Sequence, residues 1–410
     1  MKYSIFLLIL LTIILISNLS YCQRVRIGAE VFIEKYVDSL YDSRLGIICN
    51  HTSVLPNGTH IVDTLLKKGL KITALFAPEH GIRGKSLRGT PVNDTIDEKT
   101  GLKVFSLYGE IKKPTTDMLS NVDVLVFDMQ DVGARFYTYA STMAYCMIAA
   151  AENEKKFYVL DRPNPLNGVQ IEGPVLDMTL ISFFGLMPIP VRHGMTLGEM
   201  ARMAVGEGYL NPSNVDLVVV PMQNWKREMW YDETGLPWVS PSPNMISLST
   251  AIVYPGTCLF EATNISEGRG TQKPFEYIGA PKIDGKLFSQ RLNKLGLPGV
   301  SFSTVKFTPL PDSLREKKPK FKNRRCEGVY VNVTDRNKFK PVLTGIMMIN
   351  TLMKLYPKKF QLRKGLFNHL VGDERVAELL ENGKFDKNSI NIFNGQIRQF
   401  ENIRSNYLLY

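Results

Sequence analysis

The chain has 410 residues, of which 44% are hydrophobic and 22% are charged. This length suffices for two or three domains, and the composition is that of a soluble globular protein, which excludes a disordered chain. The net charge of +11 suits an acidic polymer partner such as anionic cell-wall glycan. The cysteines are widely spaced without a Cys-x-x-Cys pair, which excludes zinc-ribbon and thioredoxin-like sites.

The first 22 residues have the pattern of a secretory signal peptide. Lys2 precedes an apolar run from Ile5 to Ile16, and Ser20-Tyr21-Cys22 follows. The run is short for a transmembrane helix, so we expect cleavage, export to the periplasm or the medium, and no stable membrane anchor afterwards. A lipid on Cys22 is the less favoured alternative, because Tyr21 is bulkier than lipoprotein signals usually allow.

Residues 44–222 alternate short apolar runs with helical stretches. This alternation predicts an α/β domain with a doubly wound, mostly parallel, Rossmann-like sheet. No Gly-x-Gly-x-x-Gly follows the first strand and no Gly-Lys-Ser/Thr loop occurs, so we expect no nucleotide cofactor, and no nucleic-acid partner. The predicted strands are 45–50, 72–76, 104–107, 122–127, 157–160, 188–191 and 217–220, and the predicted helices are 59–68, 139–154 and 196–206.

A segment rich in proline and aromatic residues, 237–243, separates this region from the rest. We therefore predict a first domain over residues 23–240 and a smaller α+β domain over 241–410. The second domain should contain helices near 287–295, 344–356 and 374–382 and a strand at 328–333. Its basic run, 315–325, is either a solvated loop or a binding patch. Cys49, Cys146, Cys258 and Cys326 are predicted to be buried free thiols.

The most informative stretch follows the second predicted strand. The apolar run from Ile72 to Phe76 ends at Pro78, and Glu79, His80 and Arg83 come directly after it. Open α/β sheets build their sites beyond the carboxyl ends of the strands, so these side chains indicate a site. The alternative is a surface turn in which Glu79 pairs with Arg83.

Four other predicted strands also end in polar side chains, and parallel strands present such ends on one side of a sheet. In the second domain, a glycine- and hydroxyl-rich loop with an arginine could bind an oxygen-rich ligand or could be a structural turn. The residues concerned are Asn50, Glu79, His80, Asp128, Gln130, Asp131, Arg135, Tyr137, Asp161, Arg162, Asn164 and His193 in the first domain, and Glu261, Thr263 and Arg269 in the second.

Paired carboxyl groups are what a glycosidase requires, one to protonate the leaving oxygen and often a second on the other face of the sugar. Glu79 is the candidate acid, with Asp128, Asp131, Glu261 or Tyr137 as partners. Phe76 and Pro78 would favour the protonated form of Glu79, whereas His80 and Arg83 would favour the ionised form.

Two other hydrolytic chemistries have weaker support in the sequence. A metal site could use His51, His80, Asp128, Asp131 and His193, but no local signature such as His-Glu-x-x-His supports it, so no metal is expected. Serine hydrolysis lacks its Gly-x-Ser-x-Gly motif.

At these residues the chain resembles the exo-β-N-acetylmuramidases of the NamZ type, a family long catalogued as a domain of unknown function. The resemblance extends from about Arg26 to Tyr410. The motifs that carry it are Ala77-Pro-Glu-His-Gly-Ile-Arg-Gly84, Phe127-Asp-Met-Gln-Asp-Val-Gly-Ala-Arg-Phe-Tyr-Thr-Tyr139, Leu160-Asp-Arg-Pro-Asn-Pro-Leu-Asn-Gly168, Arg192-His-Gly-Met-Thr196, Pro241-Ser-Pro-Asn-Met245, Leu259-Phe-Glu-Ala-Thr-Asn264 and Gly268-Arg-Gly-Thr271.

The resemblance implies a Rossmann-like domain, a smaller C-terminal domain and an active-site cleft between them. It implies release of N-acetylmuramic acid from the non-reducing end of peptidoglycan fragments, with Glu79 as catalytic candidate. A departure from the family pattern is Glu267, where a small apolar residue is expected. His80, Asp128 and Tyr137 are further catalytic candidates, and the expected cleft-lining residues are Asn50, Arg83, Gln130, Arg135, Arg162, Asn164, His193, Asn244, Glu261, Thr263 and Arg269.

The lactyl carboxylate of N-acetylmuramic acid needs a cation, for which Arg135, Arg162 and Arg269 are the candidates, because a guanidinium matches a carboxylate. The competing functions are a metal-dependent hydrolase and a non-catalytic protein that binds cell-wall glycan.

Overall fold

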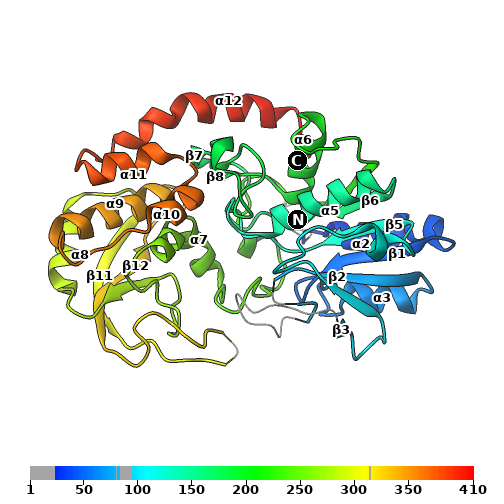
Figure 1. Cartoon of the computed structure of the whole chain (residues 1–410), viewed down its shortest axis with the longest axis horizontal. Helices are drawn as coiled ribbons and strands as arrows, with labels where there is room; N and C mark the ends of the chain where they lie inside the picture. Colours follow the sequence, from blue (N-terminus) through cyan, green and yellow to red (C-terminus); the bar gives the residue numbers. More distant parts are fainter. Residues whose placement is uncertain (1–23, 80, 84–94, 314) are drawn as a thin grey trace, which may run out of the picture.

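The computed structural model describes residues 24–79, 81–83, 95–313 and 315–410. The predicted signal peptide, including Cys22, and the candidate His80 lie outside the described residues. The chain forms two domains that lie side by side (Figure 1). Within the described ranges, no helix combines the length and the apolar character that a membrane crossing requires.

The first domain is built on a seven-stranded sheet in the order β3-β4-β2-β1-β5-β6-β9. All neighbouring strands are parallel except β3, which pairs antiparallel with β4 at one edge. Without β3, the sheet has the 3-2-1-4-5-6 order of Rossmann-like folds, and the order reverses between β1 and β5. The strands are β1 (Arg44–Cys49), β2 (Lys71–Ala77), β3 (Thr95–Ile96), β4 (Lys103–Ser106), β5 (Val124–Asp128), β6 (Lys156–Leu160) and β9 (Leu217–Val220).

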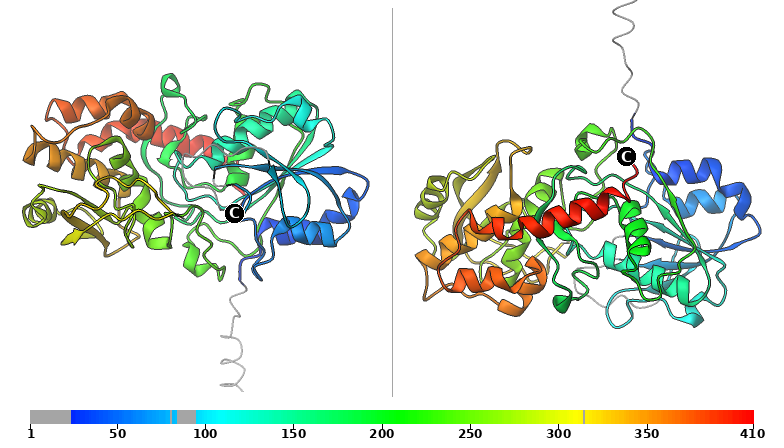
Figure 2. Two further views of the ribbon diagram at one scale, coloured as in Figure 1. Left: turned by 60° about the horizontal axis from the view of Figure 1, so that its bottom comes forward. Right: turned by 90° about the horizontal axis from the view of Figure 1, so that it is seen from above.

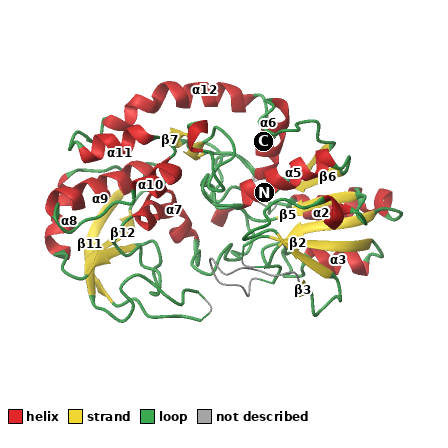
Figure 3. Cartoon of the chain, in the orientation of Figure 1, coloured by secondary structure: helices red, strands yellow, loops and turns green. Residues whose placement is uncertain are grey.

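Helices cover both faces of this sheet (Figure 3), as the doubly wound prediction requires. One apolar cluster joins α2 and α3 to one face, and another joins α5 and α6 to the other. A capping box begins α6, because Thr196 Oγ1 accepts from Glu199 N and the Glu199 carboxylate accepts from Thr196 N. The helical elements are α2 (Gly28–Lys35), η1 (Val37–Leu40), α3 (Ile61–Lys67), α4 (Thr116–Leu119), α5 (Tyr139–Glu152), η2 (Met178–Leu180), α6 (Leu197–Gly206) and η3 (Tyr231–Glu233).

One predicted strand does not belong to the parallel sheet. The run 188–191 forms β8 (Pro190–Arg192), which pairs antiparallel with β7 (Glu172–Val175) in a separate two-stranded sheet. We expected this run to be a strand of the parallel sheet, with the residues after it at the carboxyl edge of that sheet. This expectation is wrong. A short apolar run cannot reveal its pairing partner, and here the partner is a neighbouring hairpin strand.

The second domain is an α+β layer structure, as predicted. Its antiparallel sheet has the order β10-β12-β11, and helices pack against it. The elements are α7 (Leu248–Thr257), η4 (Cys258–Ala262), β10 (Tyr277–Ala280), α8 (Gly285–Lys294), β11 (Val300–Phe307), β12 (Cys326–Val333), α9 (Pro341–Leu355), α10 (Lys364–Val371), α11 (Glu374–Glu381), η5 (Ser389–Phe393) and α12 (Asn394–Ser405).

The last helix, α12, leads the chain back to the first domain (Figure 2). Arg404 donates to the backbone oxygens of Gly168 and Gly194 at 3.1 and 2.9 Å. The hydroxyl of Tyr410 donates to Asp161 Oδ2 at 2.7 Å, just beyond the end of β6. The end of the chain is therefore fastened to the domain in which the chain began.

A close crossing of α7 and α9 fixes the core of the second domain. A Cβ placed on Gly345 would lie 2.2 Å from the backbone oxygen of Gly256. Glycine in both helices allows the two backbones to touch, although α7 also contains Pro255.

We predict that Gly345→Ala destabilises the protein by about 1–3 kcal/mol, because a methyl group cannot fit at the helix crossing. Ala normally stabilises a helix interior relative to Gly by about 0.5–1 kcal/mol. Gly365→Ala is the matched control, since a Cβ there meets no atom within 4 Å. Urea unfolding measures both, and equal stability of the two variants would contradict the close crossing.

Candidate active site

The ends of β1 and β5 interlock at the point where the strand order reverses. Asn50 Oδ1 accepts from the backbone N–H and the hydroxyl of Thr52 at 2.8 and 2.6 Å. The Thr52 hydroxyl in turn accepts from Gln130 N at 3.0 Å, and the hydroxyl of Ser53 donates to the Asp128 backbone oxygen. These bonds hold two strand ends in one rigid unit, where open α/β folds place ligands.

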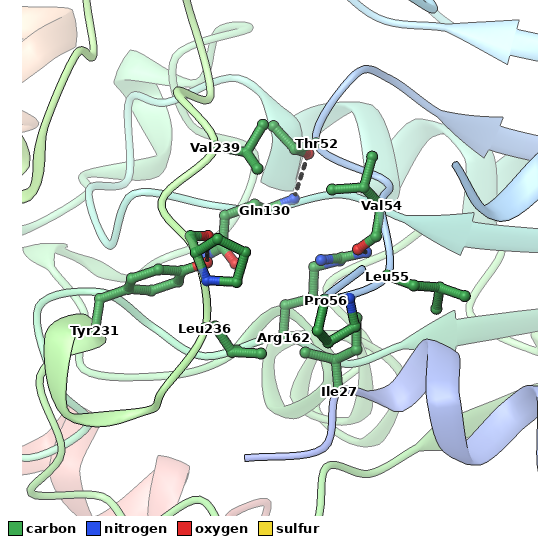
Figure 4. A pocket seen from close by; sticks show the side chains of 11 residues that line it. Ile27, Thr52, Val54, Leu55, Pro56, Gln130, Arg162, Tyr231, Leu236 and Val239 are labelled. Carbon is green, nitrogen blue, oxygen red and sulfur yellow. Dashed lines mark hydrogen bonds between the residues drawn. The ribbon is translucent and has the colours of Figure 1, made fainter. Parts of the chain in front are cut away.

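Asp128 and Arg162 form a buried ion pair beside this unit. Arg162 donates to both carboxylate oxygens, at 2.5 and 2.9 Å, and Asp128 is fully buried. Burial alone would lower the pKa of Arg162, but the charge of Asp128 raises it. Figure 4 shows Arg162 and Gln130 in the wall of a small cavity of about 20 Å³, enough for roughly one water molecule. Neither Asp128 nor Arg162 lines the larger cavity described next.

Glu79 lies directly after β2 and lines a cavity between the two domains. The enclosed part of this cavity measures about 70 Å³. Glu79 is half-buried, and Glu261 and Arg269 of the second domain contribute to the same walls. The remaining lining residues are Phe136, Tyr137, Thr138, Tyr139, Phe184, Ser242, Tyr254, Cys258, Phe275 and Leu370.

A continuous set of aromatic rings forms the walls around Glu79. Tyr137 packs edge-on against Tyr139 and Tyr254, with ring centroids 4.8 and 6.1 Å apart, and Tyr254 packs on Phe275. Burial raises the pKa of the Tyr137 hydroxyl well above its ordinary value. Burial also raises the pKa of the Tyr139 hydroxyl. These phenols therefore stay protonated and remain hydrogen-bond donors at neutral pH.

The second domain contributes a buried network of charges. Arg269 pairs with Glu261 and, at 2.9 Å, with Glu267, whose other oxygen lies 3.0 Å from Lys320 Nζ. The Arg269 guanidinium also lies 4.6 Å from the centre of the Phe275 ring. The departure from the family pattern at Glu267 is thus a buried carboxylate with two cationic partners.

Arg83 does not bring an uncompensated positive charge toward Glu79. Its guanidinium pairs with Asp97 at 2.7 Å and with Asp63 at 3.3 Å. The carboxylate of Asp97 raises the pKa of Arg83, so the group remains charged. Two carboxylates thus neutralise the cation that the sequence placed next to Glu79, which weakens the expectation that Arg83 keeps Glu79 ionised.

His193 faces Asp131, although its strand is outside the main sheet. His193 Nε2 lies 3.5 Å from Asp131 Oδ2, and His193 Nδ1 accepts from Met195 N at 3.2 Å. The proton of the neutral ring is therefore on Nε2, toward the carboxylate. The Thr196 hydroxyl bonds Asp161 at 2.7 Å and holds this loop against β6.

Several predicted site residues do not line the cavity and instead bind backbone atoms of the fold. Arg135 is 1% exposed and donates to the backbone oxygens of Pro174, Ile189 and Leu370. Burial lowers the pKa of Arg135 to about 9. Asn164, Asn244 and Thr263 also form hydrogen bonds with backbone atoms. The partners are Met195 and Leu166 for Asn164, Arg315 for Asn244, and Phe260 and Ile265 for Thr263.

Sequence reasoning did not select Tyr139, Ser242, Tyr254, Cys258 and Phe275 as site residues. Tyr254 and Cys258 lie four positions apart, so they face the same side of α7 and its continuation, η4. This four-residue spacing indicates one face of a helix, but Pro255 and Gly256 between the two residues argue against a helix in the sequence. Cys258 is a buried free thiol, as predicted, and so are Cys49, Cys146 and Cys326.

No three His, Cys, Asp or Glu side chains gather as a metal-ligand group within the described ranges. His80, one of the five residues considered for such a site, is outside those ranges. Whether the protein uses a metal therefore stays a prediction to be tested by chelation.

Fold and site together define a two-domain α/β enzyme with a carboxyl group in an aromatic cavity between the domains. Models of the N-terminal and C-terminal parts of the exo-β-N-acetylmuramidase NamZ match residues 45–249 and 252–410. The chain therefore belongs to the NamZ family of exo-β-N-acetylmuramidases, which are glycoside hydrolases.

Individual relatives agree with this assignment. The peptidoglycan β-N-acetylmuramidase NamZ of Bacillus subtilis (strain 168) is 48% identical over 389 residues, which cover 94% of this chain and 92% of the relative. Two crystal structures of DUF1343 family proteins from Bacteroides fragilis NCTC 9343 are each 34% identical. Each alignment covers 94% of this chain and 99% of the other, with TM-scores of 0.86 and 0.77.

We predict that Glu267→Gln destabilises the protein at neutral pH. Burial would raise the pKa of Glu267, but Lys320 and Arg269 lower it to about 2. Because the pKa of Glu267 is lower in the folded protein, the ionised carboxylate stabilises the fold at pH values above 4.5, the pKa in the unfolded chain. This stabilisation is lost as the pH falls toward 2. The variant should lose on the order of 3 kcal/mol at pH 7.

Chemical unfolding at pH 7, 5 and 3.5 measures this effect, and the difference from wild type should narrow at the lowest pH. Glu228→Gln, at an exposed position, is the control and should change stability by less than about 0.5 kcal/mol. A pH-independent difference for Glu267→Gln would contradict the charge network.

Proposed function

We propose that this protein is an exo-acting glycosidase that releases N-acetylmuramic acid from the non-reducing end of peptidoglycan fragments, with Glu79 as general acid. The observation that carries the proposal is the position of Glu79. It follows a central parallel strand, lines the cavity between the domains and faces aromatic walls. Proposed export, based on residues 1–22, would bring the enzyme to its substrate.

In the proposed reaction the Glu79 carboxyl group donates its proton to the glycosidic oxygen while the bond from that oxygen to the anomeric carbon breaks. Water supplies the hydroxyl group that the anomeric carbon gains, and the water proton passes to a carboxylate. Glu261 is the second carboxyl group in the lining, and Arg269 holds it in place. We propose that Glu261 stabilises the developing positive charge or activates the water.

Arg269 is the best-placed of the three arginines proposed to bind the lactyl carboxylate. It lines the cavity, whereas Arg135 and Arg162 do not. Two of its nitrogens contact Glu261 and Glu267, but Nε is buried and has no hydrogen-bond partner among the described residues. A substrate oxygen could use that donor.

The enclosed volume of about 70 Å³ holds a reacting group rather than a whole saccharide. The remainder of a bound glycan would then extend toward solvent between the domains. This arrangement suits attack at a chain end.

We predict that Glu79→Gln folds normally and loses roughly 100- to 10,000-fold in kcat on a chromogenic N-acetylmuramide, because the amide cannot donate the catalytic proton. Glu110→Gln, at an exposed position of the same domain, should retain full activity. Thermal unfolding of both variants checks the fold. A folded Glu79→Gln enzyme with near wild-type turnover would remove Glu79 from the proposed role.

We also predict that chelation with EDTA leaves the activity unchanged, because the proposed steps use carboxyl groups. Incubation with a disaccharide that ends in N-acetylmuramic acid should release the free sugar before and after dialysis against EDTA. Loss of release on dialysis, restored by a divalent metal, would favour the metal-dependent hydrolase. Retention of glycan without any release would favour a non-catalytic wall-binding protein.

A further inference from the structure

A second cavity lies in the C-terminal domain, away from Glu79. It measures about 710 Å³, within the range of roughly 300–1,000 Å³ that small-molecule sites occupy. Its walls come from α8, α9 and the segment 385–388 that precedes η5. It shares no lining residue with the cavity around Glu79.

The floor of this cavity is apolar. Met347 and Phe385 are 5% and 1% exposed, and Leu295 and Leu355 are half-buried beside them. Asn350 adds a buried amide: its Nδ2 donates to the Phe385 backbone oxygen at 2.8 Å. The Oδ1 atom of Asn350 has no hydrogen-bond partner in the described part of the chain. A buried acceptor without a donor is costly, and a ligand that reached it could satisfy it.

The rim of the cavity carries four exposed cations, Arg291, Lys294, Lys354 and Lys387. None of the four forms a salt bridge with any residue that the structure describes. Hydrogen bonds from Ser389 and Asn388 lower the pKa of Asp386 in the same lining, and the charge of Lys354 adds to that effect. The acid in the lining, Asp386, accepts from Asn388 N, Ser389 N and the Ser389 hydroxyl.

We propose that this cavity binds an anionic ligand with at least two carboxylate or phosphate groups on a compact, partly apolar body. The rim cations from two helices and a loop would bind separate acid groups, and the apolar floor would hold the body of the ligand. The apolar floor and the enclosed volume distinguish this cavity from an ordinary basic patch on the protein surface. The proposal concerns binding alone and does not depend on the reaction at Glu79.

Two probes distinguish the possible sources of the acid groups. Isothermal titration with citrate at an ionic strength of about 0.15 M tests carboxylates, and titration with inorganic pyrophosphate under the same conditions tests phosphates. Binding of either supports the site, and the tighter probe identifies the chemistry. The double variant Lys294→Gln/Lys354→Gln should weaken binding roughly tenfold or more.

The matched control is Lys286→Gln/Lys358→Gln, which removes the same charge from exposed positions outside the lining. It should keep affinity within about twofold, since distant surface charges are screened. Thr351→Trp fills the cavity without changing charge and should also weaken binding. Failure of both probes to bind, an equal loss in the control, or unaltered binding in folded Thr351→Trp would each overturn the proposal.

Discussion

The cavity around Glu79 depends on a fixed contact between two domains, because each domain supplies only part of its walls. Polar contacts across the interface provide that constraint. Arg135 of the first domain donates to the Leu370 backbone oxygen, and Leu343 N of the second domain donates to Glu172 Oε1, both at 2.8 Å. The hydrogen bond from the Tyr410 hydroxyl to Asp161 also attaches the C-terminal end of the chain to the first domain. Asp161 is fully buried, and this burial raises its pKa to about 7.

Much of the first domain was predictable from sequence, because buried parallel strands appear as apolar runs bounded by breakers. The strand ends that carry Asn50, Glu79 and Asp128 were identified this way, and the sheet order places them at neighbouring positions. The run 188–191 shows where such reasoning fails. Its composition suits any buried strand, and only the folded hairpin reveals that it pairs with β7.

The roles of the charged candidates were not predictable, because sequence does not show which groups pair. Asp128 pairs with Arg162, Arg83 pairs with Asp97, and Arg269 pairs with Glu261. All of these groups except Asp97 were candidates for substrate binding or catalysis, because the sequence shows their chemical type but not their partners. The aromatic wall was also missed, since Tyr254 and Phe275 come from the second domain and Tyr254 contacts Tyr137 only after the domains pack.

If Glu79 is the general acid, the sugar at the chain end binds with its scissile bond at Glu79, between the domains. A crystal structure of Glu79→Gln with a muramic-acid-terminated disaccharide tests this most directly. We expect the glycosidic oxygen within hydrogen-bonding distance of the side chain at position 79, and the lactyl carboxylate near Arg269, as the proposed role of Glu79 requires. A terminal sugar bound elsewhere, with position 79 out of reach of the glycosidic oxygen, would contradict it.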